Sequence, residues 1–287
     1  MNIKKHIILI PVYNDWKSLN KLLVEINKNF INDKNFETEI LIVDDCSTEK
    51  ISINKNLPAI KKIEIITLKN NSGSQKAIAI GLFYLKNLKK NSLVTVMDGD
   101  GEDNPYQLKH MLNTAIKNED NVVVSSRKSR EESIIIIFFY KIHLILTFLF
   151  TFHWISFGNF TSFNSKNLSR LLSNNSSWYA HSSSVLKNCK IKKVYAKREK
   201  RYFDKSKLNF SALIEHSLRV NSVFATRTFI SSIFYLILIF FIVPSYLNFL
   251  LIFGILSFNT ILIFIKRKHY IKNLSSLDHL MDSIKSF

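Results

Sequence analysis

The chain has 287 residues and combines a strongly basic composition with a high share of apolar residues. It holds 40 Lys and Arg against 22 Asp and Glu, which gives a formal net charge of +18, and 47% of its residues are hydrophobic. So much Phe, Ile and Leu excludes a disordered basic tail, and long uncharged apolar runs near the end exclude an ordinary soluble domain.

The excess of positive charge is confined to the second half of the chain. Residues 1–120 hold 17 basic and 15 acidic side chains, whereas residues 121–287 hold 23 basic and 7 acidic ones. Such a basic region could meet nucleic acid, anionic lipid or a phosphorylated substrate. Because its basic residues bracket apolar spans, we expect membrane lipids as partners and no nucleic acid. Two cysteines, Cys46 and Cys189, are too few for a secreted disulfide framework.

Alternating strands and helices are predicted for the first part of the chain. Short apolar runs at residues 7–12, 39–43, 63–68 and 93–97 predict four buried strands, and apolar residues recur at helical spacing after the first and third of them. This alternation predicts an α/β fold with a Rossmann-like, mostly parallel sheet, in which ligands bind beyond the carboxyl ends of the strands.

Acidic residues follow two of these predicted strands. Asp44 and Asp45 close the second strand, and Asp98 and Asp100 follow the fourth. Carboxylates that cluster at one sheet edge repel one another unless a cation lies among them, and Mg²⁺ or Mn²⁺ prefers one or two carboxylates together with phosphate oxygens. Asp after a strand is also ordinary turn chemistry. Two such pairs in one domain nevertheless favour a metal site.

Residues 133–157 predict an amphipathic helix that lies in the membrane interface. Its apolar sequence is interrupted by Lys141, His143 and His153, and its polar and interfacial side chains recur at three- and four-residue steps on one face. The members of this polar stripe are Tyr140, His143, Thr147, Thr151 and Trp154. A crossing here would put Asp98 and Asp100 on the opposite side of the membrane from the basic segment 198–207.

A two-helix membrane anchor is predicted towards the end of the sequence. Between Arg227 and Lys266 lie 38 uncharged residues, about 57 Å of straight helix against roughly 30 Å of hydrocarbon. Pro244 and Ser245 provide a break, which predicts spans at 228–243 and 246–265. Basic residues flank both outer ends and predict that these ends face the cytoplasm.

The expected organisation follows from these segments. A catalytic domain whose acidic motifs fit a nucleoside diphosphate with a cation is expected at 1–132, the interfacial helix at 133–157 and the remainder of the catalytic domain at 158–222. A transmembrane hairpin at 223–268 and a cytoplasmic tail at 269–287 complete it. The protein is therefore expected to be a multi-pass cytoplasmic membrane protein.

Four motifs, taken in order, resemble those of glycosyltransferase family 2. They are Ile10-Pro11-Val12-Tyr13-Asn14, Val43-Asp44-Asp45-Cys46-Ser47, Asn71-Ser72-Gly73 and Met97-Asp98-Gly99-Asp100-Gly101-Glu102-Asp103-Asn104-Pro105. Residues 6 to about 265 are similar to the polyprenyl-phosphate group of this family, which contains dolichol-phosphate mannose synthase and undecaprenyl-phosphate glucosyltransferases. The resemblance implies an A-type glycosyltransferase fold. It also implies a metal-dependent, inverting transfer of one sugar from a UDP- or GDP-sugar to a polyprenyl phosphate.

The resemblance assigns roles to individual residues of this chain. Pro11, Tyr13, Asp44, Asp45, Lys76 and Asp98 would bind the nucleotide. Asp98 and Asp100 would hold Mg²⁺ or Mn²⁺, and together with Arg198 and Arg201 they form the implied catalytic set. Arg127, Arg130, Arg198, Arg201, Ser206 and Lys207 would bind the diphosphate and the lipid phosphate, for which forked guanidinium groups are well suited.

Three positions depart from the family pattern. Asp204 replaces the usual Gly, Glu102 replaces a common Gln, and Asn159 stands where an acidic residue is frequent and cannot accept a proton. An anionic lipid phosphate is its own nucleophile and tolerates this Asn, whereas a hydroxyl acceptor needs a base more. Transfer to a hydroxyl of a lipid-linked glycan and a non-catalytic membrane partner subunit stay open as alternatives. The sugar and the oligomeric state, a homo-oligomer included, also stay open.

Overall fold

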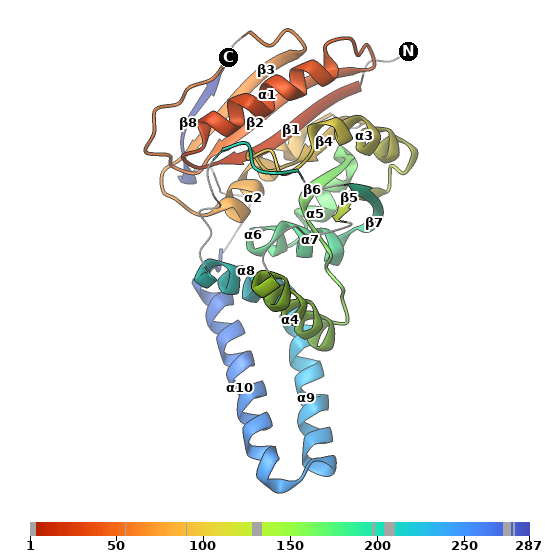
Figure 1. The fold of residues 1–287 in the computed structure, drawn as a ribbon, viewed down its shortest axis with the longest axis vertical. Helices are drawn as coiled ribbons and strands as arrows, with labels where there is room; N and C mark the ends of the chain where they lie inside the picture. The colour runs from red at the N-terminus through yellow and green to blue at the C-terminus, as the bar shows by residue number, and fades with distance from the viewer. Residues whose placement is uncertain are drawn as a thin grey trace. The chain divides into compact units, whose positions relative to one another are not determined.

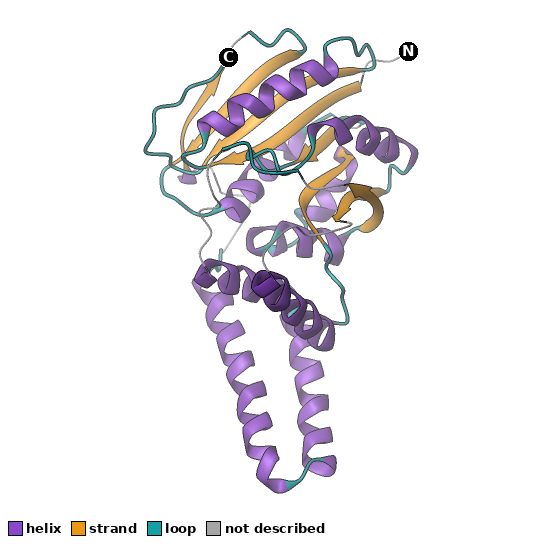
Figure 2. Ribbon diagram, viewed as in Figure 1, coloured by secondary structure: helices purple, strands orange, loops and turns teal. Residues whose placement is uncertain are grey.

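The computed structural model describes residues 4–54, 56–89, 91–127, 134–196, 199–203, 210–271, 277 and 279–287. The chain divides into two compact units, the first comprising residues 1–130, 157–206 and 272–287 and the second residues 131–156 and 207–271. The strands, orange in Figure 2, belong to the first unit, and the regular structure described in the second unit is helical.

An eight-stranded sheet organises the first unit, in the order β7-β5-β6-β4-β1-β2-β3-β8 (Figure 1). The strands are β1 (Lys4–Val12), β2 (Phe36–Asp44), β3 (Ile60–Leu68), β4 (Leu93–Val96), β5 (Asn121–Arg127), β6 (Phe157–Asn164), β7 (Lys190–Ala196) and β8 (Met281–Ser286). The pairs β1–β2, β1–β4, β2–β3 and β5–β7 are parallel. The pairs β4–β6, β5–β6 and β3–β8 are antiparallel. The four predicted strands and the mostly parallel sheet are confirmed.

Helices cover both faces of this sheet because successive side chains of a buried strand point to opposite faces. α1 (Trp16–Phe30), which lies across β1–β3 in Figure 1, and α3 (Leu108–Lys117) share a core with Ile8, Ile10 and Ile42. α2 (Ser74–Tyr84) packs on the other face of the sheet, against alternate side chains such as Leu9. It comes so close that a Cβ on Gly81 would lie 2.3 Å from a methyl of Leu9.

Short helices complete the first unit. They are η1 (Leu85–Asn87), η2 (Pro105–Gln107), η3 (Ser165–Asn167), α5 (Leu168–Leu171), α6 (Ser176–Tyr179) and α7 (His181–Asn188). α6 and α7 both contact α2. They therefore belong to the layer on the side of the sheet that α2 covers.

The second unit contains two long apolar helices, α9 (Ala225–Ile242) and α10 (Ser245–Lys268), which run side by side in Figure 1. Both are long and apolar enough to cross a membrane, judged by length and composition. The backbone leaves helical geometry at Val243 and Pro244, with ψ of 139° and 143°. The helix break expected at this Pro is therefore present.

α4 (Ile134–Thr151) and α8 (Phe210–Ser222) complete the second unit. The polar stripe of α4 is hydrogen-bonded to α8, since Asn221 Nδ2 donates to Thr147 Oγ1 at 3.1 Å and Ser217 Oγ bonds with His143 Nδ1. Apolar side chains on the rest of α4 are exposed instead. They include Phe138, Ile145, Leu146, Phe148 and Leu149. His143 and Thr147 of the stripe thus form hydrogen bonds with α8, and the helix keeps an exposed apolar surface elsewhere.

The segment expected as a tail contributes a strand to the sheet. β8 pairs with β3 in a register that places Ile284 opposite Ile66, and Phe287 N donates to Ile63 O at 2.8 Å. The expected boundary at residue 222 also differs, because α8 belongs with α4, α9 and α10 rather than with the sheet. Its packing against α10, together with its hydrogen bonds to α4, accounts for this grouping.

Candidate functional site

The motifs of the predicted site meet at one edge of the sheet. β1 lies between β2 and β4, and the three strands are parallel, so their carboxyl ends share an edge. Two backbone bonds tie these ends together, since Asp45 N donates to Val12 O at 2.8 Å and Met97 N donates to Leu9 O at 3.1 Å. Asp44 and Asp45 therefore come near the loop that carries Asp98 and Asp100.

Asp44 and Asp45 are buried and organise two loops. Asp44 Oδ1 accepts a hydrogen bond from Ser47 N at 3.0 Å. Asp45 accepts one bond with each oxygen, from Ser72 N and Gly73 N, both at 2.7 Å. Gly73 has a φ of 87°, a conformation that strongly favours glycine. Asp45 therefore holds the Asn71-Ser72-Gly73 loop against the end of β2.

Burial sets the protonation of Asp45. Loss of solvent raises the pKa of its carboxyl to about 6, and the neighbouring charge of Asp44 acts in the same direction. The two amide hydrogen bonds and the ammonium of Lys76 oppose that increase in pKa. The carboxylate is thus ionised near neutral pH but close to its titration range.

Two predicted base-binding residues, Pro11 and Tyr13, lie at the end of β1. Pro11 is buried in β1, whereas Tyr13 just beyond the strand is 40% exposed. Asn14, at a φ of 47°, accepts from Thr48 N at 2.8 Å and so connects the end of β1 to the loop after β2. Lys76 Nζ lies 5.2 Å from the centre of the Trp178 ring. The ammonium of Lys76 thus acts on Asp45, and Tyr13 follows Val12, to whose carbonyl the amide of Asp45 is bonded.

Asp98 and Asp100 lie on a tight turn after β4. Asp98 N donates to Asp103 Oδ2 at 2.9 Å, and Glu102 N donates to Asp100 Oδ1 at 3.0 Å. Gly101 has a φ of 87°, and a Cβ there would lie 2.4 Å from the Tyr202 ring. This turn requires glycine both for its backbone conformation and for the close approach of Tyr202.

Residues 199–203 run along this turn. Glu199 N donates to Glu102 O at 2.9 Å and Tyr202 N donates to Asp100 O at 3.0 Å. The ring of Phe203 lies under Lys17 Nζ of α1, 4.2 Å from its centre. The basic segment that the sequence linked to phosphates is therefore attached to the carboxylate turn through its backbone.

Arg201 joins two carboxylates. Its Nη1 donates to Asp100 Oδ2 and its Nη2 to Asp15 Oδ2, each at 2.7 Å. Only 19% of its side chain is exposed, so these charge-assisted bonds form in a partly desolvated place. Asp15 was not predicted as a site residue, although its position just after β1 was a usable signal.

The residues at this edge fit a divalent cation. Asp98 and Asp100 are partly exposed on one turn and offer hard oxygen ligands, and Mg²⁺ or Mn²⁺ commonly takes one or two carboxylates beside substrate phosphates. Among the residues that the structure describes, no group of three or more His, Cys, Asp and Glu has metal-binding spacing. Phosphate oxygens would therefore have to complete the coordination.

Most of the predicted phosphate ligands lie outside the described residues, namely Arg130, Arg198, Ser206 and Lys207, and so does Asp204, which departs from the family pattern. Of Arg127 only the backbone at the end of β5 is described. The structure brings together Asp44, Asp45, Lys76, Asp98, Asp100 and Arg201. Asn159 donates to Asp98 of this group, and Gln75 donates to Asn159 in turn. No sequence motif pointed to Gln75.

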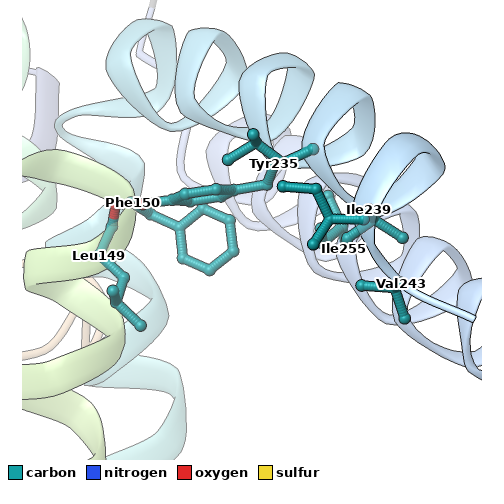
Figure 3. Close-up of a pocket in the computed structure, with 8 residues that line it drawn as sticks. Leu149, Phe150, Tyr235, Ile239, Val243 and Ile255 are labelled. Carbon is teal, nitrogen blue, oxygen red and sulfur yellow. Dashed lines mark hydrogen bonds between the residues drawn. The ribbon is translucent and has the colours of Figure 1, made fainter.

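An apolar cavity lies between α4, α9 and α10 of the second unit. Figure 3 shows Leu149, Phe150, Tyr235, Ile239, Val243 and Ile255 around it, and its volume is about 350 Å³. Tyr235 bonds to Leu149 O with its hydroxyl at 2.6 Å, and its ring meets Phe150 edge-on at 5.7 Å. The hydroxyl of Tyr235 is engaged in this hydrogen bond and the other lining side chains are apolar, so the cavity suits a hydrocarbon ligand.

Comparison with known proteins identifies related chains. A model of the family described as glycosyl transferase family 2 matches residues 7–171. An undecaprenyl-phosphate 4-deoxy-4-formamido-L-arabinose transferase of Photorhabdus laumondii is 31% identical over 135 residues, 46% of this chain and 40% of that protein. A dodecaprenyl-phosphate galacturonate synthase of Rhizobium johnstonii is 22% identical over 130 residues, 44% of this chain and 37% of that protein. The matches span less than half of each relative.

A solved structure shares the fold. Glucosyl-3-phosphoglycerate synthase from Mycobacterium tuberculosis, crystallised with phosphoglyceric acid, has a TM-score of 0.51 at 12% identity. The alignment covers 78% of this chain and 80% of that one. At this identity the likeness concerns the fold alone, and the expected A-type glycosyltransferase fold is confirmed.

Proposed function

Because this chain belongs to glycosyl transferase family 2, we propose that it transfers one sugar from a nucleoside diphosphate sugar to a polyprenyl phosphate, with inversion at the anomeric carbon. The resemblance inferred from the four motifs is confirmed by the family match. The names of the two relatives given above, an undecaprenyl-phosphate transferase and a dodecaprenyl-phosphate synthase, support this acceptor class.

The observation that carries the proposal is the meeting of two acidic motifs and a basic segment at one sheet edge. Asp45 orders the loop beside the nucleotide site, while Asp98 and Asp100 occupy the turn along which residues 199–203 run. A nucleoside diphosphate needs both a pocket for its base and compensation for its phosphates. In this assignment Pro11, Tyr13 and Asp44 bind the base and ribose.

The reaction forms one bond and breaks one. A phosphate oxygen of the acceptor bonds to the anomeric carbon as the bond from that carbon to the diphosphate oxygen breaks, and the nucleoside diphosphate leaves with the electron pair. Arg201 orients the site through Asp100 and Asp15 and, with Arg198, compensates phosphate charge. A divalent cation held by Asp98 and Asp100 would neutralise charge that develops on the leaving diphosphate.

An anionic acceptor is favoured over a hydroxyl. A phosphate monoester is ionised near neutral pH and needs no base, whereas a hydroxyl must lose a proton as it attacks. The amide of Asn159, the residue at the family's frequent acidic position, donates a hydrogen bond to Asp98. It therefore has no capacity to accept that proton.

Chain connectivity supports a membrane protein whose catalytic unit faces one side. β5 and β6 flank α4 in the sequence and are hydrogen-bonded neighbours, so both ends of α4 return to one domain and a single crossing is disfavoured. The pair α9 and α10 is likewise followed by β8 of the same sheet, which favours two crossings. Basic residues Lys266, Arg267 and Lys268 in the last turn of α10 favour the cytoplasmic side.

A transfer assay tests the proposal directly. Purified protein in detergent is incubated with undecaprenyl phosphate and a panel of UDP- and GDP-sugars, and the lipid product is measured. We expect one nucleotide sugar to be used, Asp98→Ala and Asp100→Ala each to abolish transfer, and chelation of divalent cations to do the same.

The matched control is Asp120→Ala, which removes an exposed carboxylate in the turn between α3 and β5 and should retain transfer. Full activity of both site variants, together with activity in excess chelator, would contradict the metal assignment. Transfer to a glycolipid hydroxyl but not to undecaprenyl phosphate would favour the alternative acceptor.

A further inference from the structure

Three amide and carboxylate side chains form a continuous hydrogen-bond chain that ends on Asp98. Asn159 Nδ2 on β6 donates to Asp98 Oδ1 at 3.0 Å. Gln75 Nε2 in the first turn of α2 donates to Asn159 Oδ1 at 3.1 Å. His181 N, the first amide of α7, donates to Gln75 Oε1 at 2.7 Å. We call Gln75 and Asn159 the amide relay.

The direction of every bond in the amide relay is determined by its starting point. A backbone N–H can only donate, so the oxygen of Gln75 must face His181 and its amino group must face Asn159. The oxygen of Asn159 then faces Gln75, and its amino group faces Asp98. Gln75 is only 5% exposed, which leaves little room for another arrangement.

The anchor of the amide relay is itself well fixed. The N–H of the first residue of a helix has no partner within that helix, so Gln75 caps α7. The His181 ring is fully buried, and its Nε2 bonds with Thr161 Oγ1 on β6 at 2.9 Å. Burial lowers the pKa of this imidazole to about 4, so it is neutral near pH 7. The side chain of His181 is therefore buried and uncharged beside the backbone N–H that sets the amide orientation.

We propose that Gln75 and Asn159 are positioning residues that hold the Asp98 carboxylate in the orientation needed for a divalent cation with a nucleoside diphosphate. The inference rests on the proposed function, because it assigns a role toward that cation. Asn159 acts as a hydrogen-bond donor and orients Asp98. An acidic side chain at this position would instead place two carboxylates about as close as the present 3.0 Å bond.

Gln75→Glu separates this positioning role from the capping role. A Glu carboxylate still accepts from His181 N, and negative charge suits a helix N-terminus. It cannot donate to Asn159, whose amide must turn its oxygen towards Asp98. Residues that orient a metal ligand typically change metal affinity or activity 10–100-fold when replaced, so we expect Mn²⁺ affinity with UDP or GDP to fall by roughly tenfold or more.

The experiment measures Mn²⁺ binding by electron paramagnetic resonance, with full-length protein in detergent and with UDP and GDP tested separately. Gln107→Glu, the same substitution outside the amide relay, is the control and should bind like wild type. Asn159→Ala should weaken Mn²⁺ binding as Gln75→Glu does. Thermal melting of each variant should match wild type within a few degrees, which shows that the fold is retained.

The outcomes separate this inference from the proposed function. Wild-type Mn²⁺ affinity in Gln75→Glu and Asn159→Ala would overturn the inference, as would an absence of Mn²⁺ binding by the wild-type protein. If the wild-type protein binds Mn²⁺ and the two variants do not, the inference holds even where no transfer to undecaprenyl phosphate is found. A lack of transfer to undecaprenyl phosphate would count only against the proposed acceptor.

Discussion

Asp45 is a buried ionisable residue of the candidate site. Its carboxylate receives two amide hydrogen bonds, yet burial and the charge of Asp44 still raise its pKa to about 6 from 3.8. The folded protein therefore keeps a proton on Asp45 in a pH range where the unfolded chain has lost it. Folding stability must depend on pH across that range.

We expect the contribution of Asp45 to the free energy of unfolding to fall as pH rises from about 4 to about 6 and to stay constant above. The raised pKa means that the protonated form is favoured by folding, and two pKa units correspond to roughly 3 kcal/mol. Melting temperatures of wild type and Asp45→Asn between pH 4.5 and 7.5 check this. The melting temperature of wild type minus that of Asp45→Asn should decline as the pH rises to about 6 and stay constant above it.

An exposed carboxylate provides the comparison. Asp120→Asn should melt in parallel with wild type over the same range, because the side chain of Asp120 is 69% exposed. A constant difference between wild type and Asp45→Asn would mean that Asp45 is ionised throughout.

The position of some site residues could be predicted from the sequence because their signal is local. Asp44, Asp45, Asp98 and Asp100 each follow an apolar run, and parallel strands bring such ends together. The partners of Arg201 are not local, since Asp15 lies 186 positions away along the chain. Nor does any spacing rule connect Gln75 to Asn159, because that bond depends on the helix α2 coming close to the strand β6 in the folded chain.

Among the elements, β8 has the least expected position. It hydrogen-bonds along β3, and Lys69 N, just after β3, donates to Leu280 O at 3.0 Å. Lys69 precedes the Asn71-Ser72-Gly73 loop that Asp45 holds. β8 therefore supports both an edge of the sheet and the base of a nucleotide-site loop.

Deleting residues 279–287 should expose the edge of β3 and loosen this loop. We expect a lower melting temperature, more aggregation and weaker UDP or GDP binding, because an unpaired strand edge recruits other chains. Scanning fluorimetry and calorimetric titration measure these effects. Ile284→Thr keeps a β-branched residue in the strand and should have a much smaller effect; equal nucleotide affinity in wild type and deletion would show that the loop is independent of β8.

The sequence did not indicate this strand because its composition is mixed. Residues 281–286 are Met-Asp-Ser-Ile-Lys-Ser, with little apolar alternation, and they follow two membrane-type helices. β1, β2, β3 and β4 were predictable from buried apolar runs. An edge strand with exposed side chains lacks that signal and gains its hydrogen bonds only from a neighbour distant in sequence.

For the whole molecule, connectivity predicts which segments share a side of the membrane. The sheet receives strands from before α4, from after it and from after α10. We therefore expect residues 190 and 282 on the cytoplasmic side and the turn before α10 on the other. Single cysteines at Lys190, Asp282 and Tyr246, in a protein whose Cys46 and Cys189 are changed to Ser, test this with an impermeant maleimide on intact cells.

The expected pattern is labelling of Tyr246→Cys in intact cells and of the other two variants only after permeabilisation. Each of these three native side chains is exposed in its own unit, so access depends on the membrane. Labelling of Lys190→Cys from outside would mean that α4 crosses the bilayer, and the proposed arrangement of one catalytic side would be wrong.

The pairing of β3 with β8 also constrains biogenesis. Ile66 is translated long before its partner Ile284, and both apolar helices leave the ribosome between them. The edge of β3 must therefore wait unpaired until the membrane insertion of α9 and α10 is under way, and such an edge is prone to misassembly. Slow or failed insertion should consequently appear as a folding defect of the sheet, far along the chain from the helices that caused it.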